Sequence, residues 1–169
     1  MHSCVRKALA EDLPCIPQIE KEAAALFSAY GYEAAVLADL TTLNELQNAL
    51  EKGLLWVAED QSHVVGFAFA ETILSGLILS EVDVLPSSGR KGIDKALVEN
   101  VMDHAQLYGC KCLFLTTYKN IPWNMPFYKK LGFKVLPENE YPADINMIVN
   151  REHNYGLDKS VRVVMIYCC

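Results

Sequence analysis

The chain of 169 residues lacks any long hydrophobic run, since no apolar stretch approaches the roughly 20 residues that cross a bilayer. It also lacks a basic N-terminal segment followed by an apolar core, so we expect no secretory signal. Basic residues are in the minority, with 15 lysines and arginines against 21 aspartates and glutamates. The net charge of −6 excludes a general nucleic-acid binder, which needs a basic face to displace counterions. These absences predict a cytoplasmic protein with neither a membrane nor a nucleic-acid partner.

Two other patterns are missing from the sequence. The six cysteines show no Cys-x-x-Cys ligand spacing, so we expect free thiols in a reducing compartment and no metal site. No Gly-x-Ser-x-Gly elbow occurs, and none of the four histidines has a recognisable nucleophile partner. The classical hydrolase mechanisms are therefore excluded.

The composition that the chain does have is that of an ordinary globular protein, with 51% apolar and 21% charged residues. The length suits one domain with a substantial core. Helical and strand-like hydrophobic patterns follow one another along the sequence, and no repeat or linker interrupts them. We therefore expect a single mixed α/β domain over residues 1–169.

The first half of the chain predicts two helices and several strands. The helices are expected over residues 13–27 and 42–50, and the strands over 5–9, 54–58, 64–71 and 77–84. Thr42 and Glu45 have the spacing of a capping box, which marks a helix start. Gly66 indicates a bulge or a close approach of two backbones.

The most informative stretch runs from Glu81 to Leu97. An apolar strand leads through a proline into a glycine-bearing loop, and an amphipathic helix follows. A loop at a helix N-terminus offers unpaired backbone N–H groups and the positive end of the helix dipole, which together suit a phosphate. Arg90, Lys91 and Lys95 add cationic side chains at the same place.

The second half continues the mixed pattern. The helix after the loop is expected over 93–108, with Tyr108 on its apolar face, and the next strand over 112–116 should be parallel to the strand before the loop. The remaining elements are expected as helices over 122–131 and 145–155 and strands over 133–136 and 161–167, with a loop over 137–144.

Two segments resemble the signature motifs of GNAT-type N-acetyltransferases. They are Pro86-Ser-Ser-Gly-Arg-Lys-Gly-Ile-Asp94 and Asn124-Met-Pro-Phe-Tyr-Lys-Lys-Leu-Gly-Phe133. Weaker similarities follow in family order along nearly the whole chain, among them Leu55-Trp-Val-Ala-Glu59. The resemblance implies a mixed sheet that is flanked by helices and splays between its fourth and fifth strands. A homodimer is an expectation at the level of the family alone.

The resemblance also implies that acetyl-CoA lies in this gap as the co-substrate. The pantetheine arm would run along the backbone of the strand before the loop, and the pyrophosphate would lie on the turn after it. Asn124 is chosen over Asn120 as a contact to the pantetheine amides. The implied coenzyme-binding residues are Val82, Asp83, Val84, Gly89, Arg90, Lys91, Gly92, Ile93, Asp94, Lys95 and Asn124.

Two residues are candidates for proton transfer to and from the reacting groups. Glu81, expected to share a strand face with Leu79 and Asp83, lies where a carboxylate can accept a proton from the amine. Its alternative role is an exposed or salt-bridged glutamate. Tyr128 matches the tyrosine that serves the family as the acid for the coenzyme thiolate, and its alternative role is an aromatic anchor for the short helix.

One departure from the family pattern concerns Asp94, which stands where the motif has a small residue. A carboxylate there favours the helix dipole but repels a pyrophosphate, so we expect weaker coenzyme binding unless Asp94 points away or pairs with Lys91 or Lys95. Asp94 is also the main argument for a second hypothesis, in which the chain is a non-catalytic acyl-CoA-binding or regulatory module.

The acceptor of the acetyl group is the least readable part of the sequence. The resemblance implies a small-molecule or peptide amine. Phe27, Tyr30 and Tyr32 are candidates to line its pocket, and packing in the core or at its rim is the alternative for all three.

Overall fold

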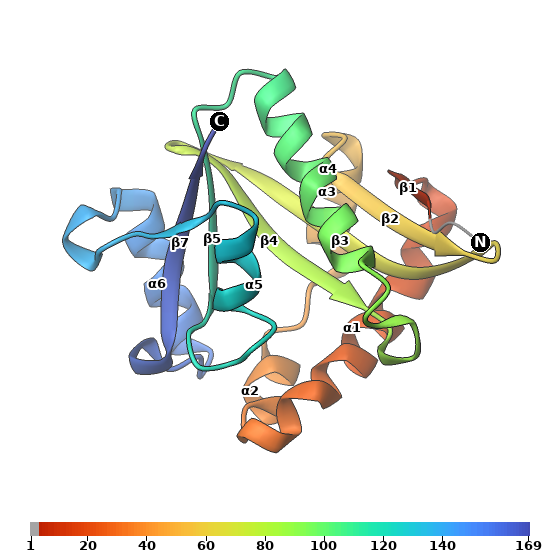
Figure 1. Ribbon diagram of the computed structural model, residues 1–169, viewed down its shortest axis with the longest axis horizontal. Coiled ribbons are helices and arrows are strands. Elements are labelled where there is room, and N and C mark those ends of the chain that lie inside the picture. Colours follow the sequence, from red (N-terminus) through yellow and green to blue (C-terminus); the bar gives the residue numbers. More distant parts are fainter. Residues whose placement is uncertain (1–3) are drawn as a thin grey trace.

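The computed structural model describes residues 4–169 as one seven-stranded mixed sheet with helices on both faces (Figure 1). The strand order is β1-β2-β3-β4-β5-β7-β6. The strands are β1 (Cys4–Lys7), β2 (Leu55–Asp60), β3 (His63–Ile73), β4 (Gly76–Val84), β5 (Cys112–Tyr118), β6 (Lys134–Val135) and β7 (Arg162–Cys168). The helices are α1 (Ile16–Ala24), α2 (Glu33–Ala38), α3 (Leu43–Glu51), α4 (Ile93–Leu107), α5 (Met125–Lys130) and α6 (Ala143–Asn154). This architecture confirms the expected mixed α/β fold.

The two faces of the sheet have separate hydrophobic cores. Helix α4, in front of the sheet in Figure 1, buries residues such as Leu97 and Val101 against β2, β3 and β4. On the opposite face α1 and α3 pack against Phe67 and Phe69 of β3. Helix α6 covers the same opposite face farther along, where Ile145 contacts the strands β4 and β5. The apolar spacing of α4 was predicted correctly except at Tyr108, which is 70% exposed beyond the end of the helix.

The predicted helix over residues 13–27 is divided into three segments. A 3-10 helix over Ala10–Cys15 leads into α1, and another over Ala25–Tyr30 follows it and ends at Gly31. Helix α2 was not predicted. The capping box of α3 is confirmed, since the Glu45 N–H donates to Thr42 Oγ1 at 3.3 Å and the Thr42 N–H donates to a Glu45 carboxylate oxygen at 2.8 Å.

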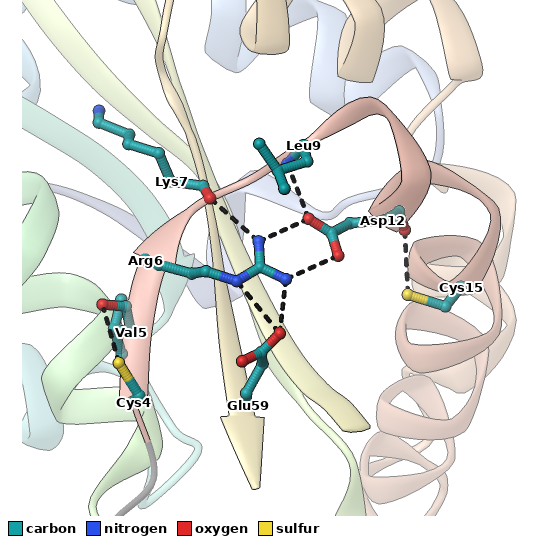
Figure 2. Close-up of polar contacts among 8 residues, drawn as sticks. All are labelled: Cys4, Val5, Arg6, Lys7, Leu9, Asp12, Cys15 and Glu59. Carbon is teal, nitrogen blue, oxygen red and sulfur yellow. Dashed lines mark hydrogen bonds and ion pairs between the residues drawn. The ribbon is translucent and has the colours of Figure 1, made fainter. Parts of the chain in front are cut away.

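An arginine joins the first strand to its surroundings (Figure 2). The Arg6 guanidinium donates two hydrogen bonds to the Asp12 carboxylate, at 2.7 and 3.0 Å, and its Nε donates to Glu59 on β2 at 3.1 Å. Asp12 also accepts the Leu9 N–H at 2.7 Å. These bonds fix the turn from β1 into the first 3-10 helix, and they hold the pKa of Asp12 below its usual value.

A β-bulge in β4 corrects one prediction about its side chains. Glu81 lies opposite Phe69, whereas Leu79 lies opposite the next residue of β3, Ala70, so Ser80 is an extra residue on β4. Leu79 therefore packs on the α4 face. It does not share a face with Glu81 as simple alternation predicted.

Gly66 confirms the predicted close approach of backbones. A Cβ at this position would lie 2.9 Å from the Asp83 carbonyl oxygen on β4. The pairing of β2 and β3 also shifts register beside this glycine, between Ala58 and Glu59.

Strands β4 and β5 pair in parallel over only two residue positions. Leu77 lies beside Leu113 and Ile78 beside Phe114, and the strands diverge beyond these pairs (Figure 1). The predicted parallel pairing and the predicted splay are thus both confirmed. The far half of β4 keeps a free backbone edge toward β5.

Two further observations concern the whole described chain. No helix within residues 4–169 is long and apolar enough to span a membrane. All six cysteines are free thiols, and Cys112 lies directly opposite Cys168 across β5 and β7.

Candidate functional site

A cleft of about 610 Å³ opens where β4 and β5 diverge. One wall is the far half of β4, and the other is the end of β5 with the α5 region. Residues of the loop before α4 and of the α1–α2 region also line the cleft. The cleft therefore joins the two motif segments that the sequence singled out.

The loop before α4 presents backbone donors at the mouth of this cleft. Gly92 caps α4 in the left-handed region at a φ of 75°, and Arg90 also has a positive φ of 62°. The first bond within the helix runs from the Ala96 N–H to the Gly92 carbonyl at 3.0 Å, so the N–H groups of residues 93–95 have no partner in the helix. A Cβ on Gly92 would meet nothing within 4 Å, so the backbone is open to an approaching anion.

Most of the predicted coenzyme-binding residues line the cleft. Those in its lining are Val82, Asp83, Val84, Gly89, Arg90, Ile93, Asp94 and Asn124. Lys91, Gly92 and Lys95 are not in the lining. The Lys91 ammonium pairs with Asp60 at 2.8 Å and the Lys95 ammonium with Glu99 at 3.6 Å, so both lysines have partners away from the cleft.

Asp94 is half-buried in the first turn of α4 and faces the cleft without a cationic partner. Neither Lys91 nor Lys95 pairs with it, and no ion pair of Asp94 exists within residues 4–169. The pairing with a lysine that would offset the charge of Asp94 is therefore absent.

Glu81 lies on the free half of β4 and accepts the Val82 N–H at 3.2 Å. Burial and the nearby charge of Glu20 raise the pKa of Glu81 to about 8. Burial and the charge of Glu81 likewise raise the pKa of Asp83 well above its usual value. Both carboxyl groups thus hold protons more firmly than carboxyl groups in water do.

Tyr128 lies on α5, whose first turn is capped by the Asn124 backbone. The Tyr128 N–H donates to the Asn124 carbonyl at 3.1 Å, and its ring makes edge contacts with Phe127 and Phe133 at centroid distances of 5.1 and 5.7 Å. Burial, followed by the negative charges of Glu81, Asp83 and Asp94, raises the pKa of Tyr128. The phenol therefore remains protonated at neutral pH and can donate a hydrogen bond into the cleft.

The three aromatic residues predicted for the acceptor pocket have different positions. Phe27 lines the cleft, together with Trp123, and their rings meet edge to face at 6.1 Å. Tyr30 contacts the outer side of Trp123 at 5.5 Å and is not in the lining. Tyr32 is also outside it, stacked on Tyr118 at 4.4 Å.

Sequence reasoning missed a polar network on the β5 side of the cleft. Arg162 pairs with Glu152 at 3.2 Å and donates to Thr116 Oγ1 at 2.8 Å, and all three side chains line the cleft. The Arg162 guanidinium also lies over the Tyr118 ring, 4.8 Å from its centroid. No local motif marks this network, because its members come from β5, α6 and β7.

Sequence reasoning also missed Glu20 on α1, which carried a readable signal. Glu20 falls four residues after Ile16 and three before Ala23, on the buried stripe of the helix. A charged residue at such a position needs a partner or a function.

The fold and a comparison with protein families together identify the class of this protein. Residues 51–135 match the family model described as acetyltransferase (GNAT) domain. The chain belongs to the GNAT family and is thereby an acetyl-CoA-dependent acyltransferase.

Solved structures of the same fold include three N-acetyltransferases or their relatives. PaiA N-acetyltransferase from Thermoplasma acidophilum, in complex with coenzyme A, has a TM-score of 0.76 and 18% identity over 100% of both chains. The ribosomal-protein-S18-alanine N-acetyltransferase from Escherichia coli has a TM-score of 0.69 and 18% identity, covering 99% of this chain and 94% of that chain. Ard1 from Thermoplasma volcanium has a TM-score of 0.69 and 17% identity, covering 99% and 98%. At these identities the likeness concerns the fold.

Proposed function

We propose that this protein transfers the acetyl group of acetyl-CoA directly to an amine, with Glu81 as the base and Tyr128 as the acid. The observation that carries the proposal is that both side chains line one cleft, at the point where β4 and β5 part. Two titratable groups with shifted pKa values in such a cleft are typical of an active site.

The described residues fit the coenzyme. The free edge of β4 offers backbone groups to the two amides of the pantetheine arm, as an added strand would use them. The open N-terminus of α4 and the cationic Arg90 suit the pyrophosphate. When bound, acetyl-CoA supplies an activated thioester: the amine lone pair forms the new C–N bond, and the C–S bond breaks with its electron pair left on sulfur.

Glu81 supplies the first proton transfer. Amines of ordinary basicity, with a pKa of about 10, are protonated at neutral pH and cannot attack until a proton is removed. A carboxylate with a pKa raised to about 8 is a better match for this task than an unperturbed one, because the difference in basicity is smaller. Glu81 therefore acts directly or through a water molecule.

Tyr128 assists the second step, in which the departing sulfur gains a proton. The departing sulfur has the acidity of a thiol, near 8.5 by analogy with cysteine, so full transfer from a phenol with a raised pKa is uphill. A hydrogen bond from Tyr128 stabilises the charge as it develops on sulfur. The sulfur is finally neutralised by the second proton that the amine nitrogen loses.

The alternative is a non-catalytic acyl-CoA-binding module, and Asp94 without a cationic partner is the observation in its favour. A mass-spectrometric assay with acetyl-CoA and a panel of monoamines, diamines, aminoglycosides and peptides separates the two. The proposal predicts an acetylated amine together with stoichiometric free coenzyme. Tight coenzyme binding with no product from any amine would instead support the binding module.

A further inference from the structure

Three carboxylates meet beside the free half of β4. Glu20 comes from α1, and Glu81 and Asp83 come from β4 on the face that α1 covers. One oxygen of each lies within 4.8 Å of the other two. Such a group of acids in a protein interior needs protons or a cation to offset its charge.

Glu20 supplies an independent sign that a ligand belongs there. Its side chain is 3% exposed, and one oxygen accepts both the N–H and the hydroxyl of Thr41, at 2.8 and 2.9 Å. The other oxygen, Oε2, is buried without any hydrogen-bond partner. A buried carboxylate oxygen is rarely left unpaired in a folded protein.

No lysine or arginine within residues 4–169 forms an ion pair with these three acids. The cations that line the cleft are Arg90, in the loop before α4, and Arg162, which is paired with Glu152. Asp39 also lines the cleft, and burial together with the nearby charge of Asp39 raises the pKa of the Glu20 carboxyl group. Acidic side chains thus outnumber basic ones beside the three carboxylates.

The walls beside the acids are apolar and aromatic. Phe27, Trp123 and Tyr118 line the same cleft as the acids, together with Leu26 and Val36. Alkyl chains pack on such walls, and aromatic faces attract cations. The combination of aromatic walls and uncompensated acids suits an aliphatic chain that carries positive charge.

We propose that the acceptor is an aliphatic di- or polyamine, whose non-reacting ammonium binds Asp83 beside the buried carboxyl group of Glu20. This inference rests on the proposed function. The reacting nitrogen must lose a proton before it attacks, so as a neutral amine it carries no positive charge to balance the acids. A second ammonium on the same molecule keeps its charge and can balance them.

The proton and electron balance follows from two nitrogens with separate roles. The reacting ammonium gives one proton to Glu81, and its lone pair then forms the C–N bond while the C–S electron pair passes to sulfur. Tyr128 donates a hydrogen bond to the departing sulfur, and the sulfur takes up the second proton that the nitrogen loses. The distant ammonium stays charged throughout.

A matched pair of acceptors tests the proposal. We expect kcat/KM for 1,4-diaminobutane to exceed that for n-butylamine by about ten- to a hundredfold, which is the range for one charge-assisted contact. Asp83→Asn and Glu20→Gln should each lower this preference toward unity, because they remove the charge that selects the second ammonium. Glu51→Gln, an exposed change at the end of α3, is the control and should leave the ratio unchanged.

The ratio separates selectivity from damage to the fold, since a merely destabilised variant loses both activities alike. Equal kcat/KM values for the two amines would overturn the inference and leave the proposed function standing, as would acetylation of peptides alone. If no amine is acetylated, the proposed function fails, and calorimetry of 1,4-diaminobutane on the coenzyme-bound protein decides the inference: binding that Asp83→Asn abolishes supports it, and no binding overturns it. Displacement of the diamine by Mg²⁺ at lower concentration would assign the acids to a metal ion instead.

Discussion

Glu81 lies directly opposite Phe69 across β3 and β4, while Leu79, two residues earlier, lies opposite Ala70. The extra residue between them, Ser80, shifts the alternation of side chains in the second half of β4 by one position. The Glu81 and Asp83 carboxylates consequently lie on the α1 side of the sheet, and the chain continues through the loop after β4 toward α4 on the other side. In the proposed function, acceptor and coenzyme would then approach the same backbone from different directions.

Replacing Glu81 tests the assigned base. Glu81→Gln should lower kcat/KM by about a hundredfold or more, in line with the loss of a general base. In the unaltered protein activity should rise with pH through about 8, because the base works in its deprotonated form and burial raises its pKa. This rise should disappear in Glu81→Gln when initial rates are measured between pH 6 and 10. If Glu81→Gln keeps both the rate and the rise of the rate with pH, Glu81 is not the base.

The same pKa shift predicts an effect on stability in the absence of ligands. An unfolded glutamate has a pKa of about 4.3, so between that value and about 8 the folded state binds more protons than the unfolded state. The free energy of unfolding should therefore fall as pH rises through this window. Between pH 5 and pH 8 the stability of Glu81→Gln relative to the unaltered protein should therefore rise by roughly 3–4 kcal/mol, since each unit of pH in this window corresponds to about 1.4 kcal/mol. Thermal unfolding at both pH values measures this, with Glu51→Gln as the control.

Removing one hydroxyl group tests the assigned acid. Tyr128→Phe keeps the ring contacts with Phe127 and Phe133 and should lower kcat by roughly ten- to a hundredfold, with little change in coenzyme affinity. Tyr108→Phe is the control, because that ring is exposed beyond the end of α4. Unaltered turnover in Tyr128→Phe would assign the residue to packing.

The charge of Asp94 can be tested by coenzyme binding alone. Asp94→Asn should tighten acetyl-CoA binding by about fivefold, since removing one unit charge near a pyrophosphate is worth on the order of 1 kcal/mol. Asp94→Gly should act in the same direction, less the effect of glycine on the first helical turn. Asp103→Asn changes an exposed charge farther along α4 and should have no effect. Calorimetry that shows unchanged or weaker binding in Asp94→Asn would contradict the repulsion.

Gly76 allows the close approach of β4 to β5 at the point where the two strands pair. A Cβ at this position would lie 2.4 Å from the Cys112 carbonyl oxygen, beside the two positions where β4 and β5 pair, and Gly76 has a φ of 146°. Gly76→Ala should destabilise the fold by roughly 2–5 kcal/mol through overlap and backbone strain. Gly31→Ala, where φ is 75° and the space is open, isolates the strain alone and should cost about 1–2 kcal/mol. Denaturant unfolding that gives equal losses for both variants would show that the contact with Cys112 is unimportant.

Much of the fold could be predicted because local pattern and tertiary packing agree. The capping box at Thr42, the stripe of α4 and the parallel β4–β5 pair all follow from sequence spacing. Helix α2 was missed because it has six residues and buries none of them, so it has no amphipathic pattern to detect. The bulge was missed because Ser80 interrupts an otherwise regular alternation without glycine or proline.

The site was predictable where one segment carries several of its residues. The motif segments placed Glu81, Tyr128 and most of the residues around Arg90 near one another, and these line the same cleft. The network of Arg162 and Glu152 was not predictable, because separate elements bring its members together. Glu20 could have been found as an acid on the buried stripe of α1.

The bulge at Ser80 also bears on how this protein can change. It divides β4 into a first half whose Leu77 and Leu79 belong to the core under α4 and a second half whose Glu81 and Asp83 face the cleft. Because the two halves follow different alternations, substitutions at the carboxylate positions leave the packed positions untouched. If these acids select the acceptor, as proposed, acceptor preference can diverge among descendants of this chain without a compensating change in the core.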